Sequence, residues 1–164
     1  MSRLFLGIGS NLGDRLAFLR AGCERLRNTD ALCVLRVSPL YETDPIGKTD
    51  QGAFLNGVIE CLSECDPRNL MSILREIERS VGRVARGRWE PRELDIDILY
   101  YGDLVISSSI VSIPHPEIPH RRFVLQPLCD LAPGFPDPLR GTRIMDLLMA
   151  CRGTEQVKRI LDTM

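Results

Sequence analysis

Apolar residues along the chain switch between two spacings, and the switches divide it into short elements. Apolar runs typical of strands are followed by stripes with the 3.6-residue period of helices. Turns rich in Gly, Pro, Asn and Asp separate them. The predicted strands cover 3–8, 32–40, 54–62 and 94–101, and the predicted helices cover 14–27 and 67–81. The order of elements is therefore β-α-β-β-α-β.

This order predicts an α+β protein with a ferredoxin-like fold, a two- to three-layer sandwich built on a mainly antiparallel sheet. The turn-rich segment between the second and third strands favours their antiparallel pairing. Beyond Val105 we expect one or two short strands, a Pro-rich turn at 114–119, and helices near 123–131 and 143–151. The pattern shows no repeat or linker, so we expect a single domain over residues 1–164.

The composition is that of an ordinary globular protein, with 44% hydrophobic and 26% charged residues. The net charge of -1 offers no general attraction to nucleic acid or membranes, so any anion site must come from local clustering. No apolar run approaches the ~18 residues of a membrane span, and the first residues lack a signal-peptide core. We therefore expect a cytoplasmic protein with reduced thiols. The six cysteines contain no C-x-x-C pair, which disfavours a structural zinc site.

Asp95 and Asp97 are the most informative polar residues, because they stand two positions apart on an apolar strand. Side chains at i and i+2 of a strand share a face, so the two carboxylates project together while Leu94, Ile96 and Ile98 enter a core. Adjacent carboxylates on a rigid strand suit Mg²⁺, which completes its coordination with water and substrate phosphate. The plain alternative is an exposed strand face with ordinary surface acids.

Four arginines precede this strand and favour the first interpretation. They are Arg83, Arg86, Arg88 and Arg92. Guanidinium groups match phosphate oxygens through paired hydrogen bonds, so the acids and arginines together predict metal-assisted chemistry on phosphates.

Two glycine patterns are rejected as nucleotide motifs. The segment 47–49 lacks the first glycine of a Walker A loop, and the segment 7–13 places its third glycine one position too late for a dinucleotide fingerprint.

Short motifs in a fixed order extend from Gly9 to about Pro133. They are Gly9-Ser10-Asn11-Leu12-Gly13-Asp14-Arg15, Tyr41-Glu42-Thr43, Phe54-Leu55-Asn56, Gly82-Arg83, Arg88-Trp89, Pro91-Arg92, Leu94-Asp95-Ile96-Asp97-Ile98-Leu99, Pro114-His115-Pro116, and Arg121 with Phe123-Val124-Leu125. In this order they resemble the 6-hydroxymethyl-7,8-dihydropterin pyrophosphokinase family of folate biosynthesis. The resemblance implies that ATP donates its terminal pyrophosphate, as one unit, to the hydroxymethyl group of a reduced pterin, and that AMP leaves. It also implies a ferredoxin-like fold without a Walker A loop.

The resemblance assigns roles to individual residues. Asp95 and Asp97 would hold two Mg²⁺ ions against the triphosphate, and Arg83 and Arg92 would act on the transferring phosphates. The positions that match ATP ligands of the family are Arg88, Trp89, Arg92, His115 and Arg121. The positions that match pterin ligands are Phe54 and Phe123, on the two ring faces, with Asn11, Thr43 and Asn56 at the ring edge. The loop 82–91 would close over the nucleotide.

Two other functions stay open at the level of the residues. Ferredoxin-like sheets also bind RNA through aromatic residues on central strands, although Asp95 and Asp97 would repel a phosphate backbone. A metal-dependent phosphohydrolase would use the same carboxylates with water as the nucleophile. We expect the partners to be ATP and the pterin alone, without nucleic acid or membrane, and the protein to be a monomer. Two positions depart from the pattern of many relatives: Phe54 replaces a tyrosine, and Asp44 replaces an apolar residue or proline.

Overall fold

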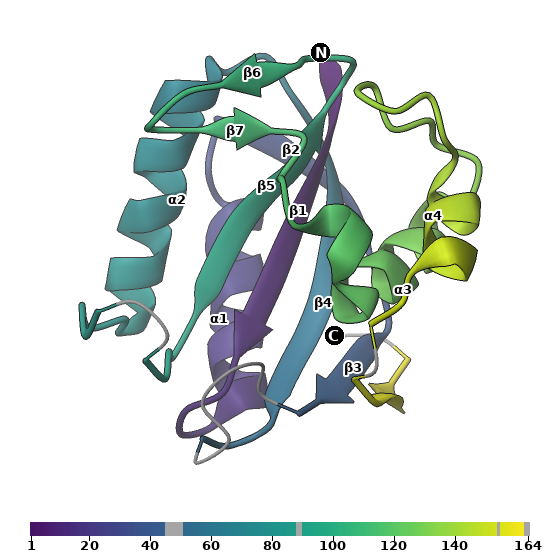
Figure 1. Ribbon diagram of the computed structural model, residues 1–164. Coiled ribbons are helices and arrows are strands. Elements are labelled where there is room, and N and C mark those ends of the chain that lie inside the picture. Colours follow the sequence, from purple (N-terminus) through teal and green to yellow (C-terminus); the bar gives the residue numbers. More distant parts are fainter. Residues whose placement is uncertain (45–50, 88–89, 154, 163–164) are drawn as a thin grey trace.

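An antiparallel sheet with helices on both faces forms the frame of the protein (Figure 1). The computed structural model describes residues 1–44, 51–87, 90–153 and 155–162. The elements are β1 (Ser2–Ser10), α1 (Arg15–Arg27), β2 (Leu32–Val37), β3 (Leu40–Thr43), β4 (Phe54–Ser63), α2 (Pro67–Val81), β5 (Asp95–Tyr101), β6 (Ile106–Ser107), β7 (Ser112–Ile113), the 3-10 helix η1 (Ile118–His120), α3 (Arg122–Leu131), α4 (Ile144–Ala150) and β8 (Val157–Leu161). The predicted order and the ferredoxin-like fold are confirmed.

The strands of the main sheet lie in the order β5-β1-β4-β3-β8, and β2 also pairs with β4. The single strand predicted over 32–40 is wrong in detail, because it is divided into β2 and β3 at Ser38 and Pro39. Pro39 has no N–H for the ladder. Ser38 compensates by donating its N–H to the Val58 carbonyl at 2.9 Å and accepting the Val58 N–H on its hydroxyl at 2.8 Å.

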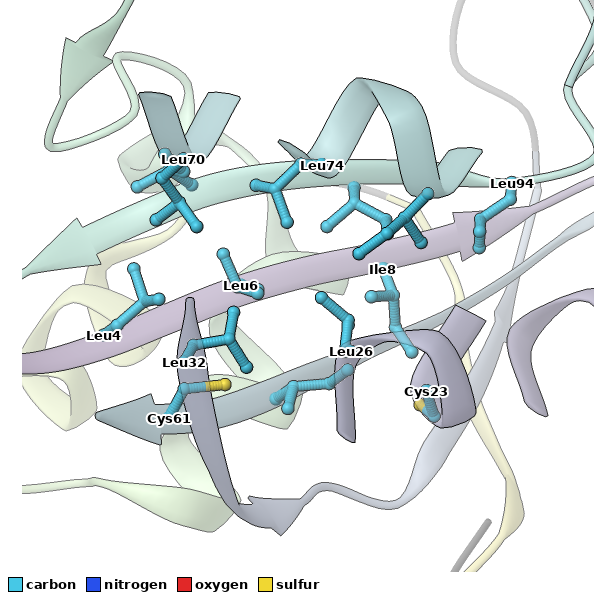
Figure 2. Packing of buried hydrophobic residues seen from close by; sticks show 14 of the residues in the cluster. Leu4, Leu6, Ile8, Cys23, Leu26, Leu32, Cys61, Leu70, Leu74 and Leu94 are labelled. Carbon is cyan, nitrogen blue, oxygen red and sulfur yellow. The ribbon is translucent and has the colours of Figure 1, made fainter. Parts of the chain in front are cut away.

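Helices α1 and α2 cover one face of the sheet and enclose the larger core (Figure 2). Asp14 begins α1 as predicted, because its carboxylate accepts the Ala17 N–H at 3.0 Å. Asp66 caps α2 in the same way, with Pro67 in the first turn. The leucines and isoleucines of the central strands alternate toward these helices, which places the other side chains of the same strands on the opposite face.

Helices α3 and α4 cover that opposite face, which we call the α3 face, and make the third layer. Its core contains Phe5 and Tyr100 from the sheet and Leu125 and Leu128 from α3. The core occupies only part of the face, because β1 continues beyond Phe5 with glycines at alternate positions. The uncovered part is where the polar residues gather.

The C-terminal strand β8 was not predicted from the sequence. It pairs with β3 and extends the sheet at that edge. In the part of the chain that is described, no helix has both the length and the apolar character needed to cross a lipid bilayer.

Candidate active site

The register of three central strands creates a hollow on the α3 face. Gly9 lies between Asn56 of β4 and Asp95 of β5, and Gly7 lies between Val58 and Asp97. The middle strand therefore contributes two residues without side chains, while its neighbours contribute an amide on one side and carboxylates on the other.

The hollow is the base of a cavity of about 540 Å³. Nine of the residues predicted for the site line it: Thr43, Phe54, Asn56, Arg92, Asp95, Asp97, His115, Arg121 and Phe123. They come from β3, β4, the loop before β5, β5 itself, the turn before η1, and the N-terminal end of α3. The cavity has the size of an ordinary small-molecule site.

At the carboxylate end of the cavity, charged side chains surround Asp95 and Asp97. Asp95 accepts a hydrogen bond from Arg83 at 2.8 Å on one oxygen and from Arg92 at 2.7 Å on the other. Among the described residues, no arginine pairs with Asp97 in this way; burial, together with the nearby charges of Asp95 and Glu78, raises its pKa to about 7. The negative charge of Asp97 is therefore unfavourable in the protein alone, and this suits a site in which a bound cation would stabilise it.

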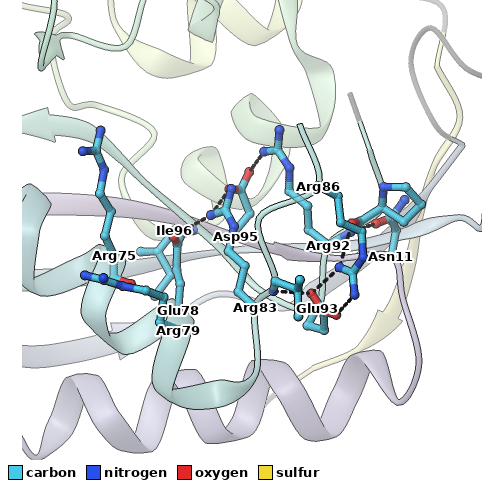
Figure 3. Close-up of polar contacts among 12 residues, drawn as sticks. Asn11, Arg75, Glu78, Arg79, Arg83, Arg86, Arg92, Glu93, Asp95 and Ile96 are labelled. Carbon is cyan, nitrogen blue, oxygen red and sulfur yellow. Dashed lines mark hydrogen bonds and ion pairs between the residues drawn. The ribbon is translucent and has the colours of Figure 1, made fainter. Parts of the chain in front are cut away.

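Glu78 belongs to the same network, although the sequence did not indicate it (Figure 3). It is a buried carboxylate of α2 that accepts the Ile96 N–H at 2.7 Å, between the two aspartates, and also pairs with Arg83. Burial raises its pKa. Glu78 thus fixes the backbone of β5 where both aspartates project. Its only sequence signal was a glutamate on the buried stripe of α2, four residues after Leu74.

The loop arginines have different positions. Arg92 lines the cavity, whereas Arg83 reaches Asp95 without being among the described residues of the lining. Arg86 is held by both oxygens of the buried Glu93, and this guanidinium lowers the pKa of Glu93 to about 2. Arg88 and Trp89 lie outside the described residues, so their predicted contacts with ATP stay predictions.

At the other end of the cavity, Asn56 donates its side-chain N–H to the Thr43 hydroxyl at 2.8 Å, and both residues are buried. Phe54 lines the cavity beside Asn56, and Phe123 lines it from the first turn of α3, where the Arg121 guanidinium lies 5.8 Å from the centre of its ring. Asn11 does not line the cavity among the described residues. Its side chain accepts the Arg92 N–H at 2.8 Å and donates to Gln51 at 3.1 Å, so it fixes neighbouring loops.

His115 and Arg121 close the cavity near the carboxylates. The Nδ1 atom of His115 accepts the Glu117 N–H at 3.2 Å, which leaves Nε2 as the donor of the neutral ring. Burial lowers the pKa of His115, and the charge of Arg121 lowers it further. A neutral histidine beside an arginine can donate a hydrogen bond to an anion without adding a second charge.

A metal ion would find a limited set of protein ligands here. Within residues 1–44, 51–87, 90–153 and 155–162, no group of three or more His, Cys, Asp or Glu side chains converges on one point. The carboxylates of Asp95 and Asp97 on neighbouring positions of one strand face are hard oxygen donors, and Mg²⁺ takes few such ligands when a substrate supplies phosphate oxygens. The residues present fit that mode of binding.

Fold and site together define a class: an α+β protein that gathers carboxylates and arginines at one cavity and has no Walker A loop. Comparison with known proteins gives the particular family. The model of the 7,8-dihydro-6-hydroxymethylpterin-pyrophosphokinase (HPPK) family matches residues 5–133, and the chain belongs to this family. The resemblance seen in the sequence motifs is confirmed.

Relatives and solved structures agree with this assignment. The chain is 37% identical over 139 residues to 2-amino-4-hydroxy-6-hydroxymethyldihydropteridine pyrophosphokinase of Aquifex aeolicus, covering 85% of this chain and 86% of that protein. It is 41% identical over 133 residues to the protein of the same name in Methylorubrum extorquens, covering 81% and 84%. A crystal structure of Plasmodium falciparum HPPK-DHPS with pteroate has a TM-score of 0.72 at 15% identity, covering 90% of this chain and 44% of that one, and shows the shared fold.

Proposed function

We propose that the protein transfers the pyrophosphate group of ATP to 6-hydroxymethyl-7,8-dihydropterin, giving the pterin diphosphate and AMP in folate biosynthesis. Membership of the pyrophosphokinase family supports this reaction. The single observation that supports the roles proposed for these residues is the arrangement of side chains in one cavity. The carboxylates and Arg92 lie on its β5 side, Phe54 and Asn56 lie on its β4 side, and Phe123 lines it from α3.

In the reaction, the hydroxymethyl oxygen of the pterin attacks the β-phosphorus of ATP. The bond from that phosphorus to the oxygen bridging the α- and β-phosphates breaks, AMP leaves, and the hydroxyl proton passes to solvent. Transfer of this kind depends on alignment and on stabilisation of charge more than on covalent help from the protein. The two ends of the cavity provide the alignment by holding the acceptor and the donor on one rigid sheet.

The pterin is a flat heterocycle with a polar edge. We assign its two faces to Phe54 and Phe123 and its edge to Asn56 and the backbone near Thr43. The Asn56 side chain is already fixed by its hydrogen bond to Thr43, so it can meet the pterin without losing rotamer freedom at that moment.

The triphosphate carries the negative charge of the reaction. We assign its protein donors to Arg92, Arg121 and Nε2 of His115, which all line the carboxylate end. Arg83, paired with Asp95, would supply further positive charge next to the transferring group. Asp95 and Asp97 would hold two Mg²⁺ ions, which when bound neutralise phosphate charge and polarise the phosphorus under attack. The protein would act as a cytoplasmic monomer with only these two small substrates, an assignment consistent with its net charge of -1.

Product analysis tests the reaction. The protein, Mg-ATP and the hydroxymethyl-dihydropterin should yield AMP and pterin diphosphate in equal amounts. Release of ADP and phosphate, or turnover of ATP that does not depend on pterin, would favour a phosphohydrolase instead.

A substitution tests the proposed metal ligands. Asp97→Ala should lower turnover by about a thousandfold, because the charge-stabilising pair is lost. The matched control is Asp103→Ala, which removes an exposed carboxylate from the turn after β5 and should leave turnover unchanged. Near-normal turnover by the folded Asp97→Ala variant would contradict the assigned role.

A further inference from the structure

The C-terminal segment, residues 151–153 and 155–162, returns to the edge of the sheet beside β3. It lies beyond the residues matched by the family model, which ends at residue 133. Its strand β8 pairs with β3 in antiparallel register, with Val157 opposite Thr43 and Arg159 opposite Tyr41. In Figure 1 this yellow segment runs beside β3. The segment is therefore in contact with a strand that carries one of the proposed pterin ligands.

The same segment also caps helix α3. The Arg122 N–H donates to a carboxylate oxygen of Glu155 at 2.6 Å. Arg121, the residue that precedes the helix, gives no side-chain cap, so the carboxylate comes from a residue 33 positions later in the chain. A negative charge at this end of a helix is favourable because it meets unpaired N–H groups and the positive end of the helix dipole. Glu155 thus replaces a local cap.

Gly153 leaves space for the hydrogen bond between Glu155 and Arg122 because it has no side chain. A side chain at Gly153 would collide with the carboxylate of Glu155. A second link between the same elements comes from Tyr41 of β3, whose hydroxyl donates to Asp130 near the end of α3 at 2.5 Å. Two contacts therefore join helix α3 to β3. Tyr41 contacts the end of the helix directly, and the C-terminal segment, which pairs with β3, holds the first turn of the helix.

The first turn of α3 carries the residues that matter for the cavity. Phe123 and Val124 line it, and Arg121 lines it immediately before the helix. None of the described residues after Val124 lines the cavity. Glu155 therefore does not line the cavity, and it can affect binding only through its contact with the backbone of Arg122.

We propose that Glu155 is a positioning residue of the pterin pocket, because its carboxylate holds the first turn of α3, and with it Phe123, at the distance from Phe54 that a stacked ring requires. This inference rests on the proposed function, which assigns Phe123 to the pterin. It makes the C-terminal segment, which lies beyond residues 5–133 matched by the family model, a determinant of acceptor binding.

The test is the equilibrium affinity for the hydroxymethyl-dihydropterin, measured with Glu155→Ala, Glu155→Gln and the control Asp162→Ala. Loss of the cap in Glu155→Ala should weaken pterin binding about fivefold, equivalent to about 1 kcal/mol, and raise the pterin KM to match while kcat stays within about twofold. Glu155→Gln keeps an oxygen acceptor and should bind within about twofold of the unmodified protein. Asp162→Ala removes an acid of the same segment that pairs with the exposed Arg159 at 2.9 Å, and should change nothing.

The outcomes separate this inference from the proposed function. If the unmodified protein neither binds the pterin nor forms AMP, the proposed function fails. If it does both and the folded Glu155→Ala variant binds pterin equally well, the role of Glu155 fails, whatever happens to its melting temperature. Equal weakening in Glu155→Gln and Glu155→Ala would also overturn it, because the hydrogen-bond acceptor would then not be the cause.

Discussion

A single methyl group at Gly9 should weaken pterin binding while the protein stays folded. Gly9 lies in the middle strand of the hollow, with Asn56 directly opposite on β4. A Cβ atom built on Gly9 would lie 2.9 Å from the Oδ1 atom of Asn56, closer than real Cβ contacts allow. Gly9→Ala must therefore move the Asn56 side chain, since the backbone of β1 is an ordinary strand that accepts alanine.

The size of the effect follows from what Asn56 would lose. The side chain is 7% exposed and donates to Thr43 at 2.8 Å, so it has little free space into which to move. Overpacking of this kind costs about 1–3 kcal/mol, and a strained hydrogen bond adds about 1 kcal/mol. We expect the free energy of unfolding to fall by about 2–4 kcal/mol and the pterin affinity to fall at least about tenfold.

The assay is a pterin titration by calorimetry or fluorescence, with Gly7→Ala as the matched control. Gly7 is on the same face of the same strand, but a Cβ there would lie 3.3 Å from the Leu99 side chain, which lines the cavity and needs to shift by only a few tenths of an ångström. This variant should keep pterin affinity within about threefold, because a small repacking costs well under 1.4 kcal/mol. The reasoning is refuted if Gly9→Ala binds as tightly as the unmodified protein, or if Gly7→Ala loses as much.

Three further predictions concern the fold. A thiol reagent at pH 8 should label the exposed Cys33 quickly but leave Cys23 and Cys61 unmodified until the protein unfolds, because burial raises their pKa values to about 11 and about 12. The unfolded chain releases these protons near pH 9, so the free energy of unfolding from urea titrations should decrease as pH rises from about 9 to 11. Tyr41→Phe should lower that free energy by about 1 kcal/mol, because Asp130 loses its donor; an unchanged urea midpoint would show that the contact does not stabilise the protein.

The parts of the site that could be predicted from the sequence are those encoded within a few residues. Asp95 and Asp97 share a face because strand side chains alternate, and both line the cavity. The starts of both large helices could be predicted for the same reason, since a cap and its target N–H stand three residues apart or less.

The parts that could not be predicted depend on contacts between distant residues. Glu78 of α2 accepts the N–H of Ile96, which stands 18 residues later in the chain. Glu155 accepts the N–H of Arg122, which stands 33 residues earlier. No local pattern distinguishes such a glutamate from a surface acid. Strand β8 was missed because only two of its five residues are even partly buried, so the two-residue alternation of apolar side chains is weak.

The arrangement separates the parts of the site that must be rigid from those that must adjust. The carboxylates, the glycines and Asn56 come from adjacent strands, whose register is fixed by their backbone ladder. The arginines come from segments at the edge of this frame, and each of these segments is held by a glutamate. Glu93 holds the loop through Arg86, and Glu155 holds the first turn of α3 beside Arg121. A loop or a helix end can change its side-chain contacts when a polyanion binds without disturbing the ladder, whereas a shift in strand register would displace every ligand at once. The buried Glu93 and the partly buried Glu155 therefore hold the arginine-bearing segments at both edges in defined positions.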